Sequence, residues 1–300
     1  MSVLSKGYIE GRRGGWHNRI VGPGGGVLLS DAKNIKVIHV GCHRSGSAFL
    51  QTKVFPKYAI CKHIFSDDTI CGRLFDNGLD HISEIKRLHP NASILIVIRN
   101  QESIINAAYR TYMKAGGTWS FPNYAKRIIA ERKYDYYKLV KGYIDLFGRN
   151  KCSVHFFENL TNIPETFVYN VIKFVGAKNL VSHDYSLVKP SPSSLTNWGY
   201  SKINFLARLL MAVGVDKVWQ RIFGHSSTPL SQQIRMQYQL WSATMDAKLI
   251  FPLFPGKLKL QVGYRRTLPL IQKAYGDGNA KLATLLNVNL EKLGYPISNS

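Results

Sequence analysis

The sequence predicts an α/β protein in which a central parallel sheet lies between layers of helices, followed by a helical C-terminal portion. Short apolar runs alternate with segments whose apolar residues recur at helical spacing. One run, Ile94–Ile98, is uniformly apolar and mostly β-branched, which is typical of a strand buried on both faces. Strands separated by helices pair in parallel, because each helix returns the chain to the same edge of the sheet.

The expected elements alternate along the first part of the folded body. Strands are predicted at residues 35–40, 58–65, 94–98 and 154–157, and helices at residues 47–55, 79–88, 102–114, 121–147 and 165–175. Asn100 is a candidate cap for the third of these helices. Gly148 and Gly176 follow two of them, and glycine readily adopts the left-handed backbone that ends a helix. The stretch 121–147 is long enough for two helices.

The chain is expected to divide into a tail and a body. Residues 1–33 are rich in Gly and Arg and are expected to form a flexible tail. Residues 34–300 are expected to form a single domain. After residue 183 the pattern loosens, and helices are expected at 202–213, 231–249 and 279–293. We interpret residues 183–260 as a helical cap or insertion.

The composition limits the class of partner. The chain has 40 Lys and Arg against 18 Asp and Glu, a formal net charge of +22, which favours polyanions such as nucleic acid, an acidic membrane surface, an anionic polysaccharide or a phosphorylated cofactor. Its four cysteines form no C-x-x-C pair, so reduced thiols in a cytoplasmic protein are the simplest expectation. No apolar run has the length of a signal peptide core or a transmembrane helix.

A loop of small residues, GCHRSGSAFLQ at 41–51, follows the first expected strand. A strand, a tight loop and a helix together present backbone N–H groups to a phosphate or sulfate. Gly41 and Gly46 have the spacing of a nucleotide-binding P-loop, but Ser47 stands where that motif has Lys. We therefore expect a P-loop-like, three-layer fold whose loop holds an anion without a metal. The expected ligands are the Arg44 side chain and the backbone of Ser45, Gly46, Ser47, Ala48 and Phe49.

Two polar segments follow other expected strands and so fall at the same edge of the sheet. Arg99 comes directly after the run 94–98 and is a candidate second phosphate contact. Asp67 and Asp68 follow the second strand, where a carboxylate can act as a general base toward a hydroxyl.

Together these segments resemble the sulfotransferases that use 3′-phosphoadenosine 5′-phosphosulfate (PAPS). The loop GCHRSGSAFLQ is similar to their 5′-phosphosulfate loop, and its Arg-Ser-Gly-Ser core to the form found in carbohydrate sulfotransferases. IRNQESIINAAY is similar to the 3′-phosphate segment, SDDTICG to S-D-E-x-L-S-G of bacterial members, and FGRNKCSVHFFENL to the strand and F-E-x-L turn that follow. GNAKLATLLNVNLEKLGYP resembles the closing helix and its terminal Gly-Tyr-Pro. The five segments occur in the family's order.

The resemblance implies transfer of the sulfuryl group of PAPS to a hydroxyl of a carbohydrate or glycolipid, as in polysaccharide biosynthesis, with residues 183–260 on the acceptor side. Arg44 would stabilise developing charge and Asp68 would take the proton, with His63 as the other candidate base. Arg99 would bind the 3′-phosphate. Ala107 stands where the family has a phosphate-binding Ser, and Ser103, one turn earlier, is a candidate replacement. No metal is implied.

Two other classes of function remain open. A kinase-like P-loop phosphotransferase shares the strand, loop and helix but needs the missing Lys and Ser or Thr. An inactive relative that binds polyanions would explain the net charge.

Trp119 and the Tyr-rich stretch 134–143 are candidate walls of an acceptor groove. We expect no specific nucleic-acid partner, a cytoplasmic location and peripheral contact with an acidic inner membrane surface.

Overall fold

The structure is a computed structural model that describes residues 34–58, 63–67, 70–71, 79, 81–114, 117–177, 209, 215–223, 230, 233–234 and 256–298. The expected tail 1–33, the candidate base Asp68 and almost all of the helices expected at 202–213 and 231–249 lie outside these residues. The chain forms two compact units. The sheet unit comprises Met1–Arg73, Asn77–Arg99 and Tyr136–Val188, and the helical unit comprises Leu74–Asp76, Asn100–Asp135 and Lys189–Ser300.

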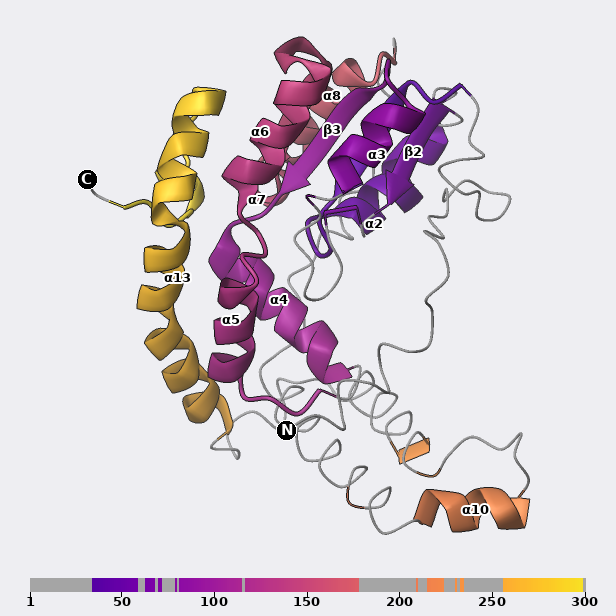
Figure 1. Ribbon diagram of the computed structural model, residues 1–300, viewed down its shortest axis with the longest axis vertical. Helices are drawn as coiled ribbons and strands as arrows, with labels where there is room; N and C mark the ends of the chain where they lie inside the picture. Colours follow the sequence, from indigo (N-terminus) through magenta and orange to yellow (C-terminus); the bar gives the residue numbers. More distant parts are fainter. Residues whose placement is uncertain are drawn as a thin grey trace. The chain divides into compact units, whose positions relative to one another are not determined.

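Four parallel strands form the centre of the sheet unit, which confirms the predicted α/β class (Figure 1). They are β1 (Val37–Gly41), β2 (Ile64–Asp67), β3 (Ser93–Ile98) and β4 (Cys152–Phe156), in the order β2-β1-β3-β4. The register pairs Val37 with Ile64 and with Ser93, so the three strands begin level with one another. Strand β2 begins and ends later than the apolar pattern predicts, because buried Ser66 pairs with a residue of β1 across the sheet.

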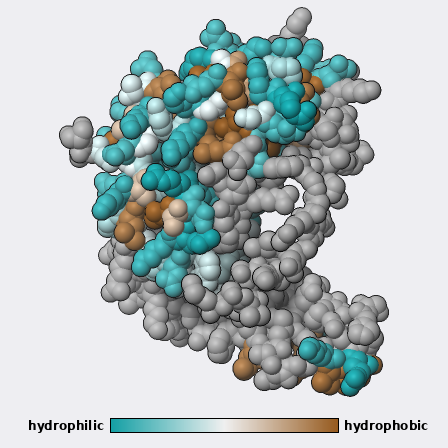
Figure 2. Space-filling view, viewed as in Figure 1, coloured by the Kyte–Doolittle hydropathy of each residue, from teal (hydrophilic) through white to brown (hydrophobic). Residues whose placement is uncertain are grey.

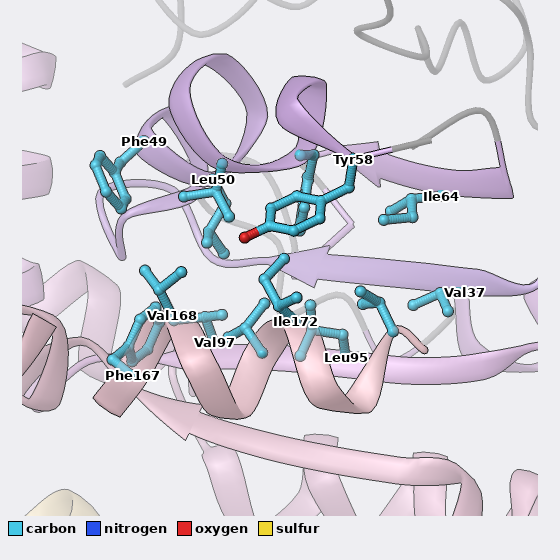
Figure 3. Packing of buried hydrophobic residues seen from close by; sticks show 14 of the residues in the cluster. Val37, Phe49, Leu50, Tyr58, Ile64, Leu95, Val97, Phe167, Val168 and Ile172 are labelled. Atoms are coloured by element: carbon cyan, nitrogen blue, oxygen red, sulfur yellow. The ribbon is translucent and has the colours of Figure 1, made fainter. Parts of the chain in front are cut away.

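Helices cover both faces of this sheet. On one face, Val37, Leu95 and Val97 pack with the helical segment that follows β1 and with α8 (Pro164–Phe174), as Figure 3 shows. The alternate strand residues point to the opposite face, which α3 (His81–Leu88) and α6 (Tyr136–Phe147) cover. The unit therefore has the expected three layers.

The helix expected at 47–55 is a continuous helical segment with three hydrogen-bond patterns. These are α2 (Ser47–Phe49), the π-helix η1 (Leu50–Val54) and the 3₁₀ helix η2 (Phe55–Lys57). The Thr52 hydroxyl donates to the Ala48 carbonyl at 2.7 Å, and Pro56 has no N–H to donate. The regular α pattern is therefore interrupted directly after the loop, as is frequent at functional sites.

The remaining helices confirm part of the prediction. They are α4 (Gln101–Lys114), α5 (Phe121–Ala130), α7 (Phe157–Asn162), α10 (Val215–Phe223), α13 (Gly256–Leu286) and the short η4 (Arg149–Lys151) and η6 (Glu291–Leu293). The stretch 121–147 is two helices, and Gly148 and Gly176 have the positive φ expected of stops. Two predictions were wrong. Helix α7 occupies an expected turn, and α13 begins well before residue 279 because its apolar spacing is irregular.

In the helical unit, a buried amide pair joins α4 to α13. Gln101 and Asn279 exchange two hydrogen bonds, with Nε2 to Oδ1 at 2.9 Å and Nδ2 to Oε1 at 3.0 Å. Asn279 also donates to the Pro296 carbonyl, and Gln101 to that of Tyr134. All of these bonds lie within the helical unit. Through them Asn279 holds the segment around Pro296 near the start of α4.

None of the described helices combines the length and the apolar character needed to cross a membrane.

His155 on β4 gives the folded state a pH dependence. Its Nε2 lies 2.9 Å from Ser153 Oγ, and its ring stands edge-on to Phe167. Burial lowers the pKa of His155 to about 4. The unfolded chain takes up this proton near pH 6.5 and the folded chain only near pH 4, so stability is lost as the pH falls through that window.

We expect the free energy of unfolding to fall by about 1–3 kcal/mol more in the wild type than in His155→Gln between pH 6.5 and pH 4. Urea denaturation at a series of pH values measures the difference. If the free energy of unfolding depended equally on pH in the two proteins, His155 would not be the cause of the pH dependence.

Candidate functional site

The loop at 42–46 and Arg99 lie at the point where the order of strands reverses. The chain passes from β1 to β2 on one side and then to β3 on the other side of β1. In open parallel sheets, the crevice between two such strands, at their carboxyl ends, is where ligands bind. The loop follows β1 and Arg99 follows β3, so the structure brings together two segments that the sequence placed at one edge.

The loop is closed by hydrogen bonds of its own. The Ser45 N–H donates to the Cys42 carbonyl at 3.0 Å, and the Ser45 hydroxyl donates to the same oxygen at 2.5 Å. The Leu50 N–H then donates to the Gly46 carbonyl at 3.1 Å, which starts the helical segment. Ser47 is buried, and its hydroxyl has no hydrogen-bond partner among the described residues. A buried hydroxyl of this kind is suited to donate to a ligand.

Arg44 reaches its place through an unusual backbone. Its φ is 69°, in the left-handed region that costs a residue with a Cβ about 1–2 kcal/mol. The side chain is exposed. The loop therefore places a cation at its outer surface while its small residues turn inward.

Gly46 packs directly against α7. Its φ is 92°, and a Cβ at this position would lie 2.7 Å from Leu160 Cδ2 and 3.3 Å from Phe157 Cδ2. The positive φ favours glycine because other residues rarely adopt it, and the short distance to Leu160 leaves no room for a Cβ. Helix α7 thus supports the loop from below.

Arg99 is held against the loop by three contacts. Its Nη1 donates to the Arg44 carbonyl at 3.0 Å, and its guanidinium lies 4.3 Å from the centre of the Phe157 ring. The Tyr136 hydroxyl donates to the Arg99 carbonyl at 2.8 Å. The guanidinium is therefore fixed at the loop before any ligand arrives.

A polar network ties the carboxyl end of β2 to β1 and to the helical segment that follows the loop. Ser66 is the register partner of His39, and its hydroxyl lies 2.7 Å from His39 Nδ1. Gln51 Nε2 donates to Ser66 Oγ at 3.0 Å and to its carbonyl at 3.3 Å. Because Gln51 donates to the oxygen, the Ser66 hydrogen is available to His39. Asp67, the next residue, is the last residue of β2 and places a carboxylate at this edge.

His63 does not join these residues. It precedes β2, where its carbonyl accepts the Lys36 N–H and its Nδ1 lies 3.1 Å from the Asn34 carbonyl. Both contacts lie where the chain enters β1, at the amino edge of the sheet and opposite the loop. The strand expected at 58–65 begins only at Ile64, and this later start accounts for the misplacement of His63.

Ser103 and Ala107 lie one turn apart on α4, in the helical unit. The Ser103 N–H donates to Asn100 Oδ1 at 2.8 Å, which confirms Asn100 as the cap of α4. The Ser103 hydroxyl is 3.4 Å from the Asn100 carbonyl, and Ala107 is buried.

The candidate acceptor walls differ in exposure. Trp119 is 41% exposed, whereas Tyr134, Tyr136 and Tyr143 are buried core residues. Burial raises the pKa of the Tyr134 and Tyr143 hydroxyls, so these two rings belong to the interior as neutral phenols.

The expectation of reduced thiols was wrong for two cysteines. Cys42 and Cys71 form a disulfide, whereas Cys152 is free and buried. A spacing of 29 residues carries no sequence signal, but β1 and β2 are neighbours, and the residues that follow them meet at one edge. Within the described ranges, no group of three or more His, Cys, Asp or Glu side chains could hold a metal ion.

Comparisons with known proteins add little. No protein-family model matches the chain, and no curated protein does. Among solved structures, a sulfotransferase from Alicyclobacillus acidocaldarius is similar over 60% of this chain and 95% of its own, with 16% identity and a TM-score of 0.41. That likeness is too slight to carry an assignment.

Gly46→Ala tests the close packing of the loop, and Gly176→Ala is its matched control. Both glycines have positive φ, but no atom lies within 4 Å of a Cβ built on Gly176. We expect Gly176→Ala to cost about 1–2 kcal/mol of stability for the backbone alone. Gly46→Ala should cost about 1–3 kcal/mol more, because Leu160 must move. Chemical denaturation compares the two, and equal costs would show that α7 does not confine the loop.

Proposed function

We propose that this chain is a sulfotransferase that moves the sulfuryl group of PAPS to a hydroxyl of a carbohydrate or glycolipid. The observation that carries the proposal is the contact between Arg99 and the loop at the reversal point of a parallel sheet, which we interpret as an anion cradle. There Arg99 is fixed against a P-loop-like turn that carries Arg44 inside the turn and has Ser47 and Ala48 where a P-loop has Lys and then Ser or Thr. The five family-like segments of the sequence support the same reading.

Each residue of the cradle has a role in this proposal. Backbone N–H groups at the start of the helical segment and the buried Ser47 hydroxyl would hold the 5′-phosphosulfate. Arg44 would neutralise charge that develops on the bridging oxygen as the sulfur–oxygen bond breaks. Arg99, held by Phe157 and the loop, would bind a phosphate of the donor. In the family resemblance, this is the 3′-phosphate, with Ser103 and the position of Ala107 on the helix that follows.

The acceptor hydroxyl would attack sulfur in line with the departing phosphate. Its proton would pass to a carboxylate at the end of β2, with Asp68 preferred and Asp67, the last residue of the strand, beside it. His63 is not retained in this role, since it lies at the opposite edge. Positioning supplies most of the rest of the rate, as in phosphoryl transfer.

The acceptor class rests on charge and exposure. A formal net charge of +22 suits an anionic donor and an acidic glycan. Trp119, 41% exposed, offers an apolar ring face of the kind that stacks on sugars. Carbohydrate is therefore the first acceptor class to screen, with labelled PAPS.

Arg44→Ala should weaken binding of adenosine 3′,5′-bisphosphate by about 10–100-fold, because one charge-assisted hydrogen bond is lost. Calorimetry in EDTA measures this, and sulfate transfer from labelled PAPS should fall at least as far. Arg132→Ala is the matched control, since Arg132 is also exposed and also has positive φ. It should change stability similarly and leave binding unchanged.

Other outcomes would assign another function. Binding of ATP with magnesium, but not of the bisphosphate in EDTA, would identify a phosphotransferase. Salt-sensitive binding to heparin or duplex DNA without turnover would identify an inactive polyanion-binding protein. Equal effects of Arg44→Ala and Arg132→Ala would reject the assigned site.

We also propose that the chain touches an acidic membrane surface through α10. Val218 is 58% and Ile222 67% exposed, and their spacing places both on one side of the helix. Lys217 and Arg221 are exposed beside them. Figure 2 shows hydrophobic and hydrophilic residues side by side on α10. An apolar side flanked by cations suits an anionic bilayer interface.

Replacing Val218 and Ile222 by Ser should weaken binding to vesicles of phosphatidylglycerol and phosphatidylcholine by about tenfold, because buried apolar area is lost. Leu146→Ser, at an exposed apolar residue on α6, is the control and should have no effect. Flotation at two salt concentrations measures both. Equal binding to vesicles of phosphatidylcholine alone would contradict the charge argument.

A further inference from the structure

The Cys42–Cys71 disulfide joins the loop at 42–46 to the chain after β2. Cys42 is the first residue after β1, and Cys71 comes four residues after Asp67, the last residue of β2. The register pairs Val40 with Asp67, so both strands end close together at the carboxyl edge. The bond therefore closes a covalent ring of residues 42–71 at that edge.

Cys42 is also the residue on which the loop closes. Its carbonyl accepts both the backbone N–H and the hydroxyl of Ser45. Cys42 and Ser45 are fully buried. A change in the backbone of Cys42 would therefore move the turn that leads to Gly46 and Ser47, where the anion is held.

At its other end, the disulfide restrains the acidic segment. The sequence from Asp67 to Cys71 contains both candidate carboxylates, and Ile70 and Cys71 are buried. The start of this segment is fixed by β2 and its end by the disulfide. The two described ends of this segment are therefore both anchored at the carboxyl edge of the sheet.

Reduction would remove only one of two links. The hydrogen bonds from Gln51 to Ser66, and between Ser66 and His39, hold the end of β2 in either redox state. The sulfur bridge is not part of the hydrophobic cluster that the sheet forms with α8 and the helical segment after β1, since that cluster includes neither cysteine. Breaking it would loosen the loop and the acidic segment and leave the fold in place.

We infer that Cys42 and Cys71 form a reversible dithiol–disulfide site whose oxidised form is the one that binds the donor. This inference concerns the site of the proposed function and rests on it for the identity of the ligand. A dithiol reductant attacks one sulfur as its thiolate and forms a mixed disulfide. Its second thiol then closes its own ring disulfide. Two electrons and two protons thus pass to Cys42 and Cys71, and the reductant is oxidised.

Binding and redox state are then linked in both directions. A ligand that prefers the oxidised form must stabilise the disulfide by the same factor. A tenfold preference lowers the reduction potential of the pair by about 30 mV. Because both cysteines are buried, reduction requires the loop or the acidic segment to open, so a bound ligand should also slow it.

Calorimetry of the oxidised protein and of the protein reduced with dithiothreitol tests the inference, with adenosine 3′,5′-bisphosphate and inorganic pyrophosphate as separate probes. Mass spectrometry after iodoacetamide treatment verifies that Cys42 and Cys71 are alkylated only after reduction. We expect reduction to weaken binding of both probes at least tenfold. Cys42→Ser/Cys71→Ser should bind like the reduced protein and ignore the reductant. Cys152→Ala, which lacks the free buried thiol of β4, should respond like the wild type.

The outcomes separate the two proposals. Equal affinity of the oxidised and reduced forms for the bisphosphate would overturn the redox inference and leave the function standing. Loss of pyrophosphate binding on reduction, with no bisphosphate binding in either form, would support the redox site and overturn the function. Absence of binding of both probes in both forms would overturn both. A double variant that still responds to dithiothreitol would also overturn the redox inference.

Discussion

The loop depends on the absence of a side chain at Gly46. There the backbone turns with a φ of 92°, and α7 occupies the space that a Cβ would need. Phe157 of α7 lies against this turn and also beneath the Arg99 guanidinium, so one aromatic ring supports both the loop and the arginine that contacts it. If the turn stood farther from α7, the contact of Arg99 with the Arg44 carbonyl would be lost as well. The proposed cradle is therefore a consequence of close packing as much as of charge.

The sheet supplies the second condition, because its strand order brings distant residues to one edge. A polar network attaches the end of β2 to β1 and the helical segment, and a disulfide attaches the chain after β2 to the loop. Tyr136, at the start of α6, fixes the backbone of Arg99. These links come from separate parts of the sheet unit. Rigid positioning of this kind suits a reaction in which geometry and preorganised charge supply most of the rate.

Much of this arrangement was predictable from local sequence. Apolar β-branched runs gave the strands, and Asn100, Gly148 and Gly176 marked helix ends through side-chain and backbone chemistry that is local to each residue. The bounds of β2, the helix α7 and the Cys42–Cys71 pair were not predictable in this way, because each is decided by partners far along the chain. His63 shows the effect on a site: a strand start displaced by a few residues moved a candidate base to the wrong edge. Local patterns in one sequence carry no information about contacts with such distant residues.

The His39–Ser66 pair has a consequence for how the chain finds its fold. These residues are register partners on neighbouring strands, and both are buried on the same face. If β2 slipped by one residue, Ser66 would turn to the other face, and an imidazole would be left in the core beside Phe55 without its partner hydroxyl. The apolar residues around them would tolerate such a slip far better. The pair therefore raises the free energy of misaligned intermediates and favours a single register of β1 and β2.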